Sequence, residues 1–140
     1  MKAQIKVTPI DSGISSEMAD AVQGFISANG LTLSVMDKAW AVYWIDGDAF
    51  GILGFAGCNV GNRIADVPVY HIAQGKTRNE KWLAMQAHER LFERVCGFIA
   101  DTVGSGTKAF FYIAPESQKH WEGFAERVNG RKAERYVMEV

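Results

Sequence analysis

The feature that most constrains the fold of this chain is a junction near its middle, where a strand-like run leads into a capped helix. Val67–Ala73 is apolar and rich in β-branched residues, which predicts a strand, and Gln74–Lys76 is a short loop. Thr77 and Glu80 have the spacing of a capping box, in which each side chain accepts a hydrogen bond from the other residue's backbone N–H. Because the N–H groups at a helix start can hold an anion, this junction is the first candidate binding site.

The remaining elements follow from hydrophobic periodicity and turn residues. Apolar residues at helical spacing predict helices, Asp46-Gly47-Asp48 predicts a hairpin turn, and Leu31–Asp37 is compatible with a loop or a short helix. Asn59–Asp66 predicts a polar loop. The predicted order is a strand at Gln4–Thr8, a helix capped by Asp11 or Ser12 and closed by Asn29-Gly30, strands at Lys38–Ile45, Ala49–Ala56 and Val67–Ala73, a helix from Thr77 to Gly104, a strand at Lys108–Ala114, a helix from Pro115 to Gly130, and a strand at Arg131–Val140.

Two local features qualify the predicted strands, and one describes the long helix. Pro68 has no backbone N–H, so its strand must have an edge, a bulge or a break in the ladder at that point. Glycines in the strand Ala49–Ala56 and just after it predict a bulge or a close backbone approach. The apolar stripe of the long helix is predicted to bury the following side chains: Trp82, Met85, Phe92, Val95, Cys96, Ile99 and Val103.

Length and composition predict a single domain over residues 1–140 with an ordinary core. The chain has 140 residues, of which 48% are hydrophobic and 22% charged, as in soluble globular domains. A net charge of −1 favours neither nucleic acid nor an anionic membrane surface. No apolar run approaches the roughly 20 residues of a membrane span, and the N-terminal residues lack the apolar core of a secretory signal. These observations favour a cytoplasmic protein that binds no nucleic acid.

Several chemical classes of site are not supported by the sequence. Cys58 and Cys96 belong to no metal-binding motif and are predicted to be reduced, buried thiols. His71, His88 and His120 are scattered, so no metal site is predicted, and His88 is expected at a helix edge or an interface. Nucleophile-elbow, P-loop and dinucleotide-binding patterns do not occur in the sequence.

The order of elements, together with a segment near the C-terminus, resembles the GNAT acyltransferase family. In Ser117–Gly130, Gln118 stands where the family pattern has Asn, Phe124 where it has Phe, and Glu126-Arg127 where it has Glu-Lys. The resemblance implies an α/β (α+β) fold, a single GNAT-like domain with a central mixed, mostly antiparallel sheet flanked by helices on both faces. This order is matched along nearly the whole chain, whereas residues are matched only in the last quarter.

The resemblance also implies a site for acetyl-CoA, whose pyrophosphate the family binds with backbone amides of a glycine-rich loop. That loop has the pattern Gln/Arg-x-x-Gly-x-Gly/Ala, and here Thr77 and Asn79 replace the two small residues. Side chains at these points obstruct the approach of a phosphate, so the loop is interpreted as degenerate. The residues implied for cofactor binding are Ile72, Ala73, Gln74, Gly75, Lys76, Thr77, Arg78 and Asn79.

Two residues are candidates for proton transfer. The tyrosine that often protonates the leaving thiolate in the family falls at Ala125, which has no proton to donate. Tyr112 is a possible substitute or a structural tyrosine, and His71 is a possible general base or a structural histidine. Glu17 borders the implied acceptor cleft, although a role at the helix start also explains it.

Two functions remain open at the level of the sequence. One is N-acyltransfer from acetyl-CoA or another acyl-CoA to an amine acceptor. The other is non-catalytic interaction or assembly with protein partners or with itself, because the chain also resembles a small internal virion protein of short-tailed phages that has an eroded cofactor loop. In that case it would occupy a host cytoplasm and a virion. Trp40, Trp44, Trp82 and Trp121 are candidates either for the core or for a contact surface.

Overall fold

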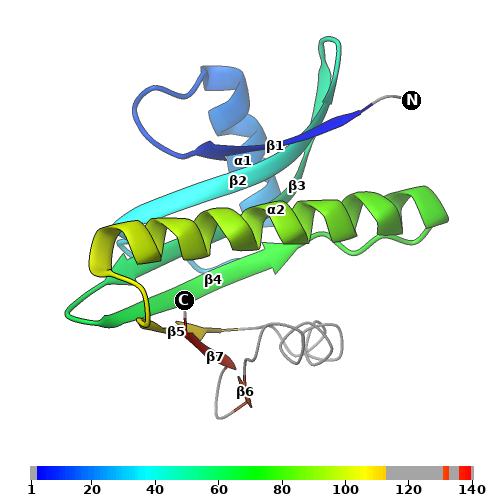
Figure 1. Cartoon of the computed structure of the whole chain (residues 1–140). Coiled ribbons are helices and arrows are strands. Elements are labelled where there is room, and N and C mark those ends of the chain that lie inside the picture. The colour runs from blue at the N-terminus through cyan, green and yellow to red at the C-terminus, as the bar shows by residue number, and fades with distance from the viewer. Residues whose placement is uncertain (1–2, 113–130, 133–135, 140) are drawn as a thin grey trace.

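The computed structural model describes residues 3–112, 131–132 and 136–139, which form one seven-stranded sheet with two helices (Figure 1). Over residues 3–111 the order of strands and helices is the predicted one, a strand, a helix, three strands, a helix and a strand. In chain order, the elements are β1 (Gln4–Pro9), α1 (Ser16–Ala28), β2 (Lys38–Asp46), β3 (Ala49–Val60), β4 (Ile64–Ile72), α2 (Arg78–Val103), β5 (Lys108–Phe111), β6 (Arg131–Lys132) and β7 (Tyr136–Glu139).

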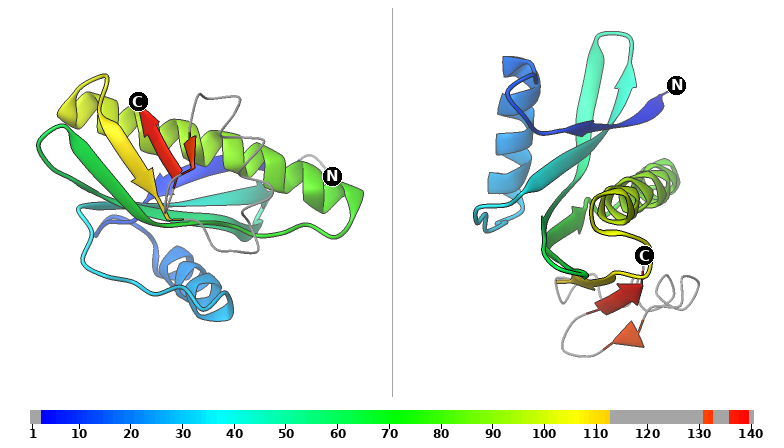
Figure 2. Two further views of the ribbon diagram at one scale, coloured as in Figure 1. Left: turned by 90° about the horizontal axis from the view of Figure 1, so that it is seen from below. Right: turned by 60° about the vertical axis from the view of Figure 1, so that its left-hand side comes forward.

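The sheet is mixed and mostly antiparallel. Its strand order is β1-β2-β3-β4-β5-β7-β6, and the β4–β5 pair alone is parallel among the strands described. Because α2 connects β4 to the parallel strand β5, it crosses one face of the sheet, whereas α1 lies on the opposite face (Figure 2). The predicted fold class, a mixed sheet with helices on both faces, is confirmed.

Each face of the sheet has its own apolar cluster, because neighbouring residues of a strand point to opposite faces. Under α1, Val22 and Ile26 pack with Ala41, Phe55 and Val69. Under α2 the cluster is larger, and its fully buried members include Trp40, Val42, Leu91, Val95, Ile99 and Phe111. β2 is therefore covered on both sides, as its apolar sequence predicts.

Two boundaries differ from the sequence prediction. Asn59–Asp66 is not a loop, since β3 extends to Val60, β4 begins at Ile64, and Gly61 N–H donates to the carbonyl of Ile64 at 2.8 Å in the turn. Helix α1 begins at Ser16 rather than near Asp11, because Ser15 is the side chain that accepts from the N–H of Met18. Of the two alternatives left open for Leu31–Asp37, the structure has the loop. Residues that can cap a helix occur at several positions in Asp11–Ser16, so the sequence alone did not identify which of them is the N-cap residue.

The buried stripe of α2 is rotated by about one residue from the predicted stripe. Its buried residues are Leu83, Ala87, His88, Leu91, Val95 and Ile99, whereas Trp82 and Met85 are 49% and 43% exposed. The prediction that Trp82 and Met85 are buried was therefore wrong. The aromatic and thioether side chains are the larger ones, but the sheet presents only enough apolar surface for the stripe that starts at Leu83.

The predicted irregularities in the central strands are present. The β3–β4 register shifts between Gly57 and Asn59, opposite the part of β4 that contains Pro68, where the missing N–H interrupts the ladder. The β2–β3 register shifts beside Gly54. A Cβ atom on Gly54 would lie 2.8 Å from the carbonyl oxygen of His71, so glycine permits the close approach of β4 at the position before its end.

The C-terminal predictions are tested only in part. β5 lies inside the sheet between β4 and β7, as its apolar sequence predicts. The predicted terminal strand over Arg131–Val140 contains two short antiparallel strands, β6 and β7. The predicted helix from Pro115, the matched segment Ser117–Gly130, Ala125, His120 and Trp121 lie outside the described residues. In the part of the chain that the structure describes, no helix has both the length and the apolarity needed to cross a membrane.

Candidate functional site

The candidate site lies where β4 and β5 separate. The two strands pair in parallel from Ile64 opposite Lys108 to Val67 opposite Phe111, and Tyr112 N–H then donates to the carbonyl of Val67 at 3.1 Å. β4 continues for five more residues, to Ile72, without a β5 partner. The last residues of β4 and the start of α2 therefore lie beyond the paired part of the two parallel strands (Figure 1).

The start of α2 is closed by its own side chains. Thr77 is the N-cap residue, and its hydroxyl oxygen accepts from the backbone N–H of Glu80 at 3.1 Å. In return, the Glu80 carboxylate accepts from the backbone N–H of Thr77 at 2.9 Å. The N–H of Lys81 donates to the carbonyl of Thr77 at 2.9 Å. The predicted capping box is thus formed, and the amides of Arg78 and Asn79 are the first-turn donors that these bonds do not use.

The loop before α2 lies against the first turn of the helix. A Cβ atom on Gly75 would lie 2.4 Å from both the carbonyl carbon of Glu80 and the backbone nitrogen of Lys81. No side chain fits in that space, so the backbone of Gly75 packs directly on the peptide unit between those two residues. Gly75, which stands at a variable position of the family pattern, therefore seats the loop on the helix start. It does not open a space over the first-turn amides.

Electrostatics at this helix start also oppose a second anion. Hydrogen bonds from the backbone and side chain of Thr77 lower the pKa of Glu80, so its carboxylate is charged at neutral pH. A carboxylate at a helix N-terminus already has the favourable interaction with the helix dipole that a phosphate would otherwise have. Lys76 and Arg78 supply nearby positive charge, and both side chains are exposed.

These observations decide whether the residues present fit the diphosphate of acetyl-CoA. A diphosphate needs several backbone amides free to donate, and two amides of the helix start, those of Thr77 and Glu80, already have side-chain acceptors. Gln74 and Lys76 lie in the loop, and Ile72 and Ala73 end β4, where Ala73 N–H donates to the carbonyl of Leu53 at 2.7 Å. In this conformation a diphosphate would have to compete with the capping box for the amides of Thr77 and Glu80.

His71 has a partner that sequence reasoning missed. Its Nε2 lies 3.0 Å from Oδ1 of Asn29, which is 42 residues away in the sequence and is the C-cap residue of α1. The imidazole ring also lies against the ring of Phe25, with centroids 5.9 Å apart. The sequence shows Asn29 only as the end of a helix. No local signal in the sequence indicates that this helix end meets the end of β4.

The amide orientation of Asn29 determines which His71 nitrogen carries a proton. Asn29 Nδ2 donates to the carbonyl of Phe25 at 2.8 Å, so the opposite orientation would direct Oδ1 at another acceptor. Oδ1 therefore faces His71, and only an N–H on Nε2 can donate to it. In the neutral ring, the proton is then on Nε2.

Tyr112 lies on the other side of the point where the strands separate. It follows the last residue of β5 directly, and its side chain is 46% exposed. His71 lies on β4, four residues beyond the last pair with β5. The exposure of Tyr112 is consistent with a role at the surface of this site and excludes it from the core. Glu17 lies in the first turn of α1, as predicted.

A buried tyrosine–histidine pair lies beneath this region. The Tyr70 hydroxyl lies 3.1 Å from Nδ1 of His88 and donates to the carbonyl of His88 at 3.1 Å. Both residues are buried, so the prediction that His88 lies at a helix edge or interface was wrong. Burial raises the pKa of Tyr70 well above its usual value, which keeps the phenol neutral. The pair joins β4 to α2 and supports the strand that carries His71.

Neither cysteine is poised for chemistry, and no metal centre is formed by the described residues. Burial raises the pKa of Cys58 and of Cys96 to about 12, so both thiols are protonated at neutral pH. Both are free, with Cys58 buried and Cys96 half-buried. Among the residues that the structure describes, no group of three or more His, Cys, Asp or Glu side chains could hold a metal ion.

The capping box predicts a pH dependence of stability. The pKa of Glu80 is lowered in the folded chain, so its stabilisation is complete above the unfolded pKa near 4.5 and is lost as pH falls through the folded value. Glu80→Gln keeps an acceptor at this position but does not titrate. Melting temperatures of both proteins from pH 7 to pH 3 are expected to converge below about pH 5. A difference that stays constant over this range would contradict the assignment.

Comparisons with known proteins agree with the architecture. No protein-family model matches the chain, and no curated protein matches it in sequence. In structure, the chain is similar to an acetyltransferase of the GNAT family from Staphylococcus aureus Mu50, solved by crystallography. The two share 9% sequence identity and a TM-score of 0.61, over 97% of this chain and 99% of the other. At this identity the likeness concerns the fold alone, and the fold of this chain is that of the GNAT acetyltransferases.

Proposed function

We propose that this chain is a non-catalytic interaction protein built on the GNAT fold. The observation that carries the proposal is the capping box at Thr77 and Glu80, which uses the backbone donors that an acyl-CoA diphosphate would need. An enzyme of this kind depends on that anchor, because it holds the thioester in place for attack. If the capping box occupies these amides, the chain keeps the stable GNAT fold but lacks the contacts that hold the cofactor.

Exposed apolar side chains on α2 support an interaction role. Trp82 and Met85 are three residues apart on one side of the helix, and they are 49% and 43% exposed. Tryptophan and methionine are enriched at protein interfaces, where their side chains fill pockets on a partner. Their position directly after the capping box places a contact surface where the enzymes of this fold admit their cofactor. The partner is another protein or a second copy of this chain.

A calorimetric titration tests the proposal. We expect no heat when acetyl-CoA, CoA or desulfo-CoA is added to the protein at millimolar concentration. Binding of any of them with a dissociation constant below about 100 µM, equivalent to about −5.5 kcal/mol, would contradict the closed anchor. A parallel measurement of molar mass by light scattering shows whether the chain self-associates. The variant Trp82→Ala should reduce any association, whereas Lys81→Ala on the neighbouring position should not.

An assembly role in a phage particle is the more specific form of this proposal. It rests on the likeness to a small internal virion protein and on the closed cofactor loop described above. Genes for a portal or tail tube beside the gene for this chain would support it. Location within a metabolic operon would count against it.

A second candidate function is N-acyltransfer, and the contact between His71 and Asn29 favours it. The Asn29 amide holds the imidazole ring in one orientation at the end of β4, and histidine is the side chain most often used as a general base. A structural histidine needs no such oriented partner at a half-exposed position. Transfer of a labelled acetyl group to a panel of amines would establish activity. His71→Gln should then abolish that activity, and Asn29→Ala should lower it by roughly tenfold or more, because general-base catalysis contributes 10²–10⁴-fold.

A further inference from the structure

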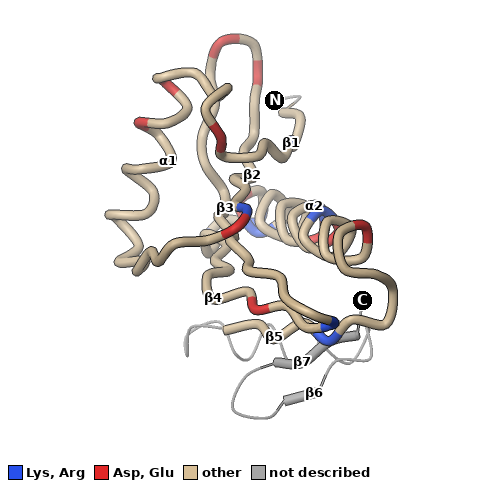
Figure 3. The backbone as a smooth tube through the Cα atoms, turned by 90° about the vertical axis from the view of Figure 1, so that its left-hand side faces the viewer, with Lys and Arg blue, Asp and Glu red and all other residues tan. Residues whose placement is uncertain are grey.

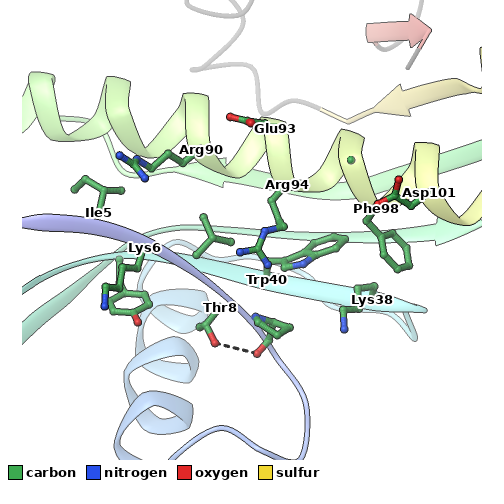
Figure 4. Close-up of a pocket in the computed structure, with 14 residues that line it drawn as sticks. Ile5, Lys6, Thr8, Lys38, Trp40, Arg90, Glu93, Arg94, Phe98 and Asp101 are labelled. Carbon is green, nitrogen blue, oxygen red and sulfur yellow. Dashed lines mark hydrogen bonds between the residues drawn. The ribbon is translucent and has the colours of Figure 1, made fainter. Parts of the chain in front are cut away.

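A second concave site lies on the α2 face of the sheet, where α2 passes over β1 and β2 (Figure 4). It is a groove of about 790 Å³ lined by residues of all three elements. That volume lies within the usual range for sites that bind small molecules. Ile5 and Trp40, both buried, form part of its apolar floor. We call it the basic groove because of its charged residues.

Positive charge predominates in the basic groove. The charged residues of its lining are Lys6, Lys38, Arg90, Glu93, Arg94 and Asp101. Figure 4 shows Arg90 and Arg94 directed toward β1 and β2, whereas Glu93 points away from the groove and Lys6 and Lys38 extend away from α2. The two guanidinium groups therefore dominate the charge inside the groove, in a chain whose net charge is −1. Many of the acidic positions lie elsewhere, at the tip of the β2–β3 hairpin and beside α1 (Figure 3). The field at the groove therefore attracts anions, although the molecule as a whole does not.

Arg90 and Arg94 form the centre of the positive charge. They are four residues apart on α2, so their side chains emerge from the same side of the helix, about 5–6 Å apart at Cβ. Figure 4 shows the Arg94 guanidinium beside the indole of Trp40, and the Arg90 guanidinium above Ile5. Within the described part of the chain, neither guanidinium takes part in an ion pair. Two like charges at this spacing repel each other, and an anion between them would relieve that repulsion.

We propose that the basic groove binds a small phosphate-bearing anion, with the guanidinium groups of Arg90 and Arg94 as its main contacts. The planar fork of a guanidinium matches the oxygen atoms of a phosphoryl group, and two forks on adjacent turns can contact one phosphate or two linked phosphates. The enclosed volume suits a small molecule better than a chain segment.

The basic groove is separate from the helix start discussed above. Arg78 and Arg90 are twelve residues apart on α2, which corresponds to roughly 18 Å along the helix axis. The groove also lies beside β1 and β2, whereas the helix start follows β4. Anion binding here therefore neither requires nor restores the diphosphate anchor. The two proposals can fail independently.

The experiment is a titration of the whole chain with pyrophosphate and, separately, with ADP, in buffer of low ionic strength. Both probes are expected to bind, and affinity should fall as salt is added. Arg90→Gln and Arg94→Gln should each weaken binding by about tenfold or more, since hydrogen bonds to charged groups are the stronger ones. Arg90→Lys and Arg94→Lys keep the charge and lose the fork, so they should bind with intermediate affinity.

Lys81→Gln is the matched control, because it removes an exposed cation from the other end of the same helix. Its affinity for both probes should stay within twofold of that of the unmodified chain. Binding of ADP but not pyrophosphate would identify an organic phosphate as the ligand, and equal binding would identify the phosphoryl group alone. The proposal is wrong if neither probe binds, if Lys81→Gln has the larger effect, or if a hexaglutamate peptide binds where the phosphates do not.

Discussion

Replacement of Phe111 by alanine is expected to lower the free energy of unfolding by about 3–5 kcal/mol, the usual cost of truncating a buried phenylalanine. Phe111 is fully buried at the last pair between β4 and β5. Its ring lies 5.7 Å from that of Tyr70 and 5.4 Å from that of Phe92, measured between centroids. Truncation would leave a cavity between β4, β5 and α2, because these rings are held by the backbone and cannot close the space.

Phe110→Ala is the matched control for this prediction. Phe110 is the preceding residue of β5, so its side chain points to the opposite face, and it is only half-buried. Chemical denaturation should show a clearly smaller loss for Phe110→Ala than for Phe111→Ala. Equal losses would mean that the aromatic cluster under α2 does not hold the two parallel strands together. Proton exchange at the amide of Tyr112, bonded to the carbonyl of Val67, should accelerate in Phe111→Ala alone.

Removal of the capping box is expected to create CoA binding, which we do not expect in the unmodified chain. The variant Thr77→Gly, Asn79→Gly and Glu80→Ala restores the two small residues of the family loop and removes the competing carboxylate. The N–H groups of Thr77 and Glu80 then lose their side-chain acceptors and can donate to a diphosphate. Each hydrogen bond to a charged group contributes about 1.5–3 kcal/mol, so affinity should rise by roughly tenfold to more than a hundredfold.

The control for this variant keeps the cap. Thr77→Ser retains a hydroxyl that accepts from the N–H of Glu80, so it should not bind CoA. Calorimetry of both proteins with CoA, together with their melting temperatures, separates loss of the cap from loss of the fold. Failure of the triple variant to bind CoA, while folded, would show that the capping box is not what excludes the cofactor. The proposal of a non-catalytic role would then lose the observation that supports it.

The local features of the fold could be predicted because they depend on residues close together in the sequence. The capping box at Thr77 and Glu80 needs only a spacing of three residues, and it is formed as predicted. Pro68 disturbs its strand wherever that strand lies, since a missing N–H is a covalent property. The order of strands and helices follows from periodicities of 2 and 3.6 residues, which both act over a few residues.

The orientation of each element could not be obtained in the same way. Trp82 and Leu83 are adjacent apolar residues of α2, and the choice of which is buried depends on the surface that the sheet offers. Asn29 ends α1 in any fold, but its contact with His71 exists only because α1 and the end of β4 lie on the same side of the sheet. The basic groove likewise combines Lys38 with Arg90 and Arg94, which are far apart in the chain.

Short-range hydrogen bonds and side-chain spacing thus specified in advance where α2 begins and that Thr77 and Glu80 cap it. The packing of two helices on opposite faces of one sheet then selected His71 and Asn29 as partners and placed Arg90 and Arg94 over β1 and β2. The physical reason is that a contact between distant segments depends on the order and register of strands, which many sequences share. A cap or a bulge depends on the few residues that form it.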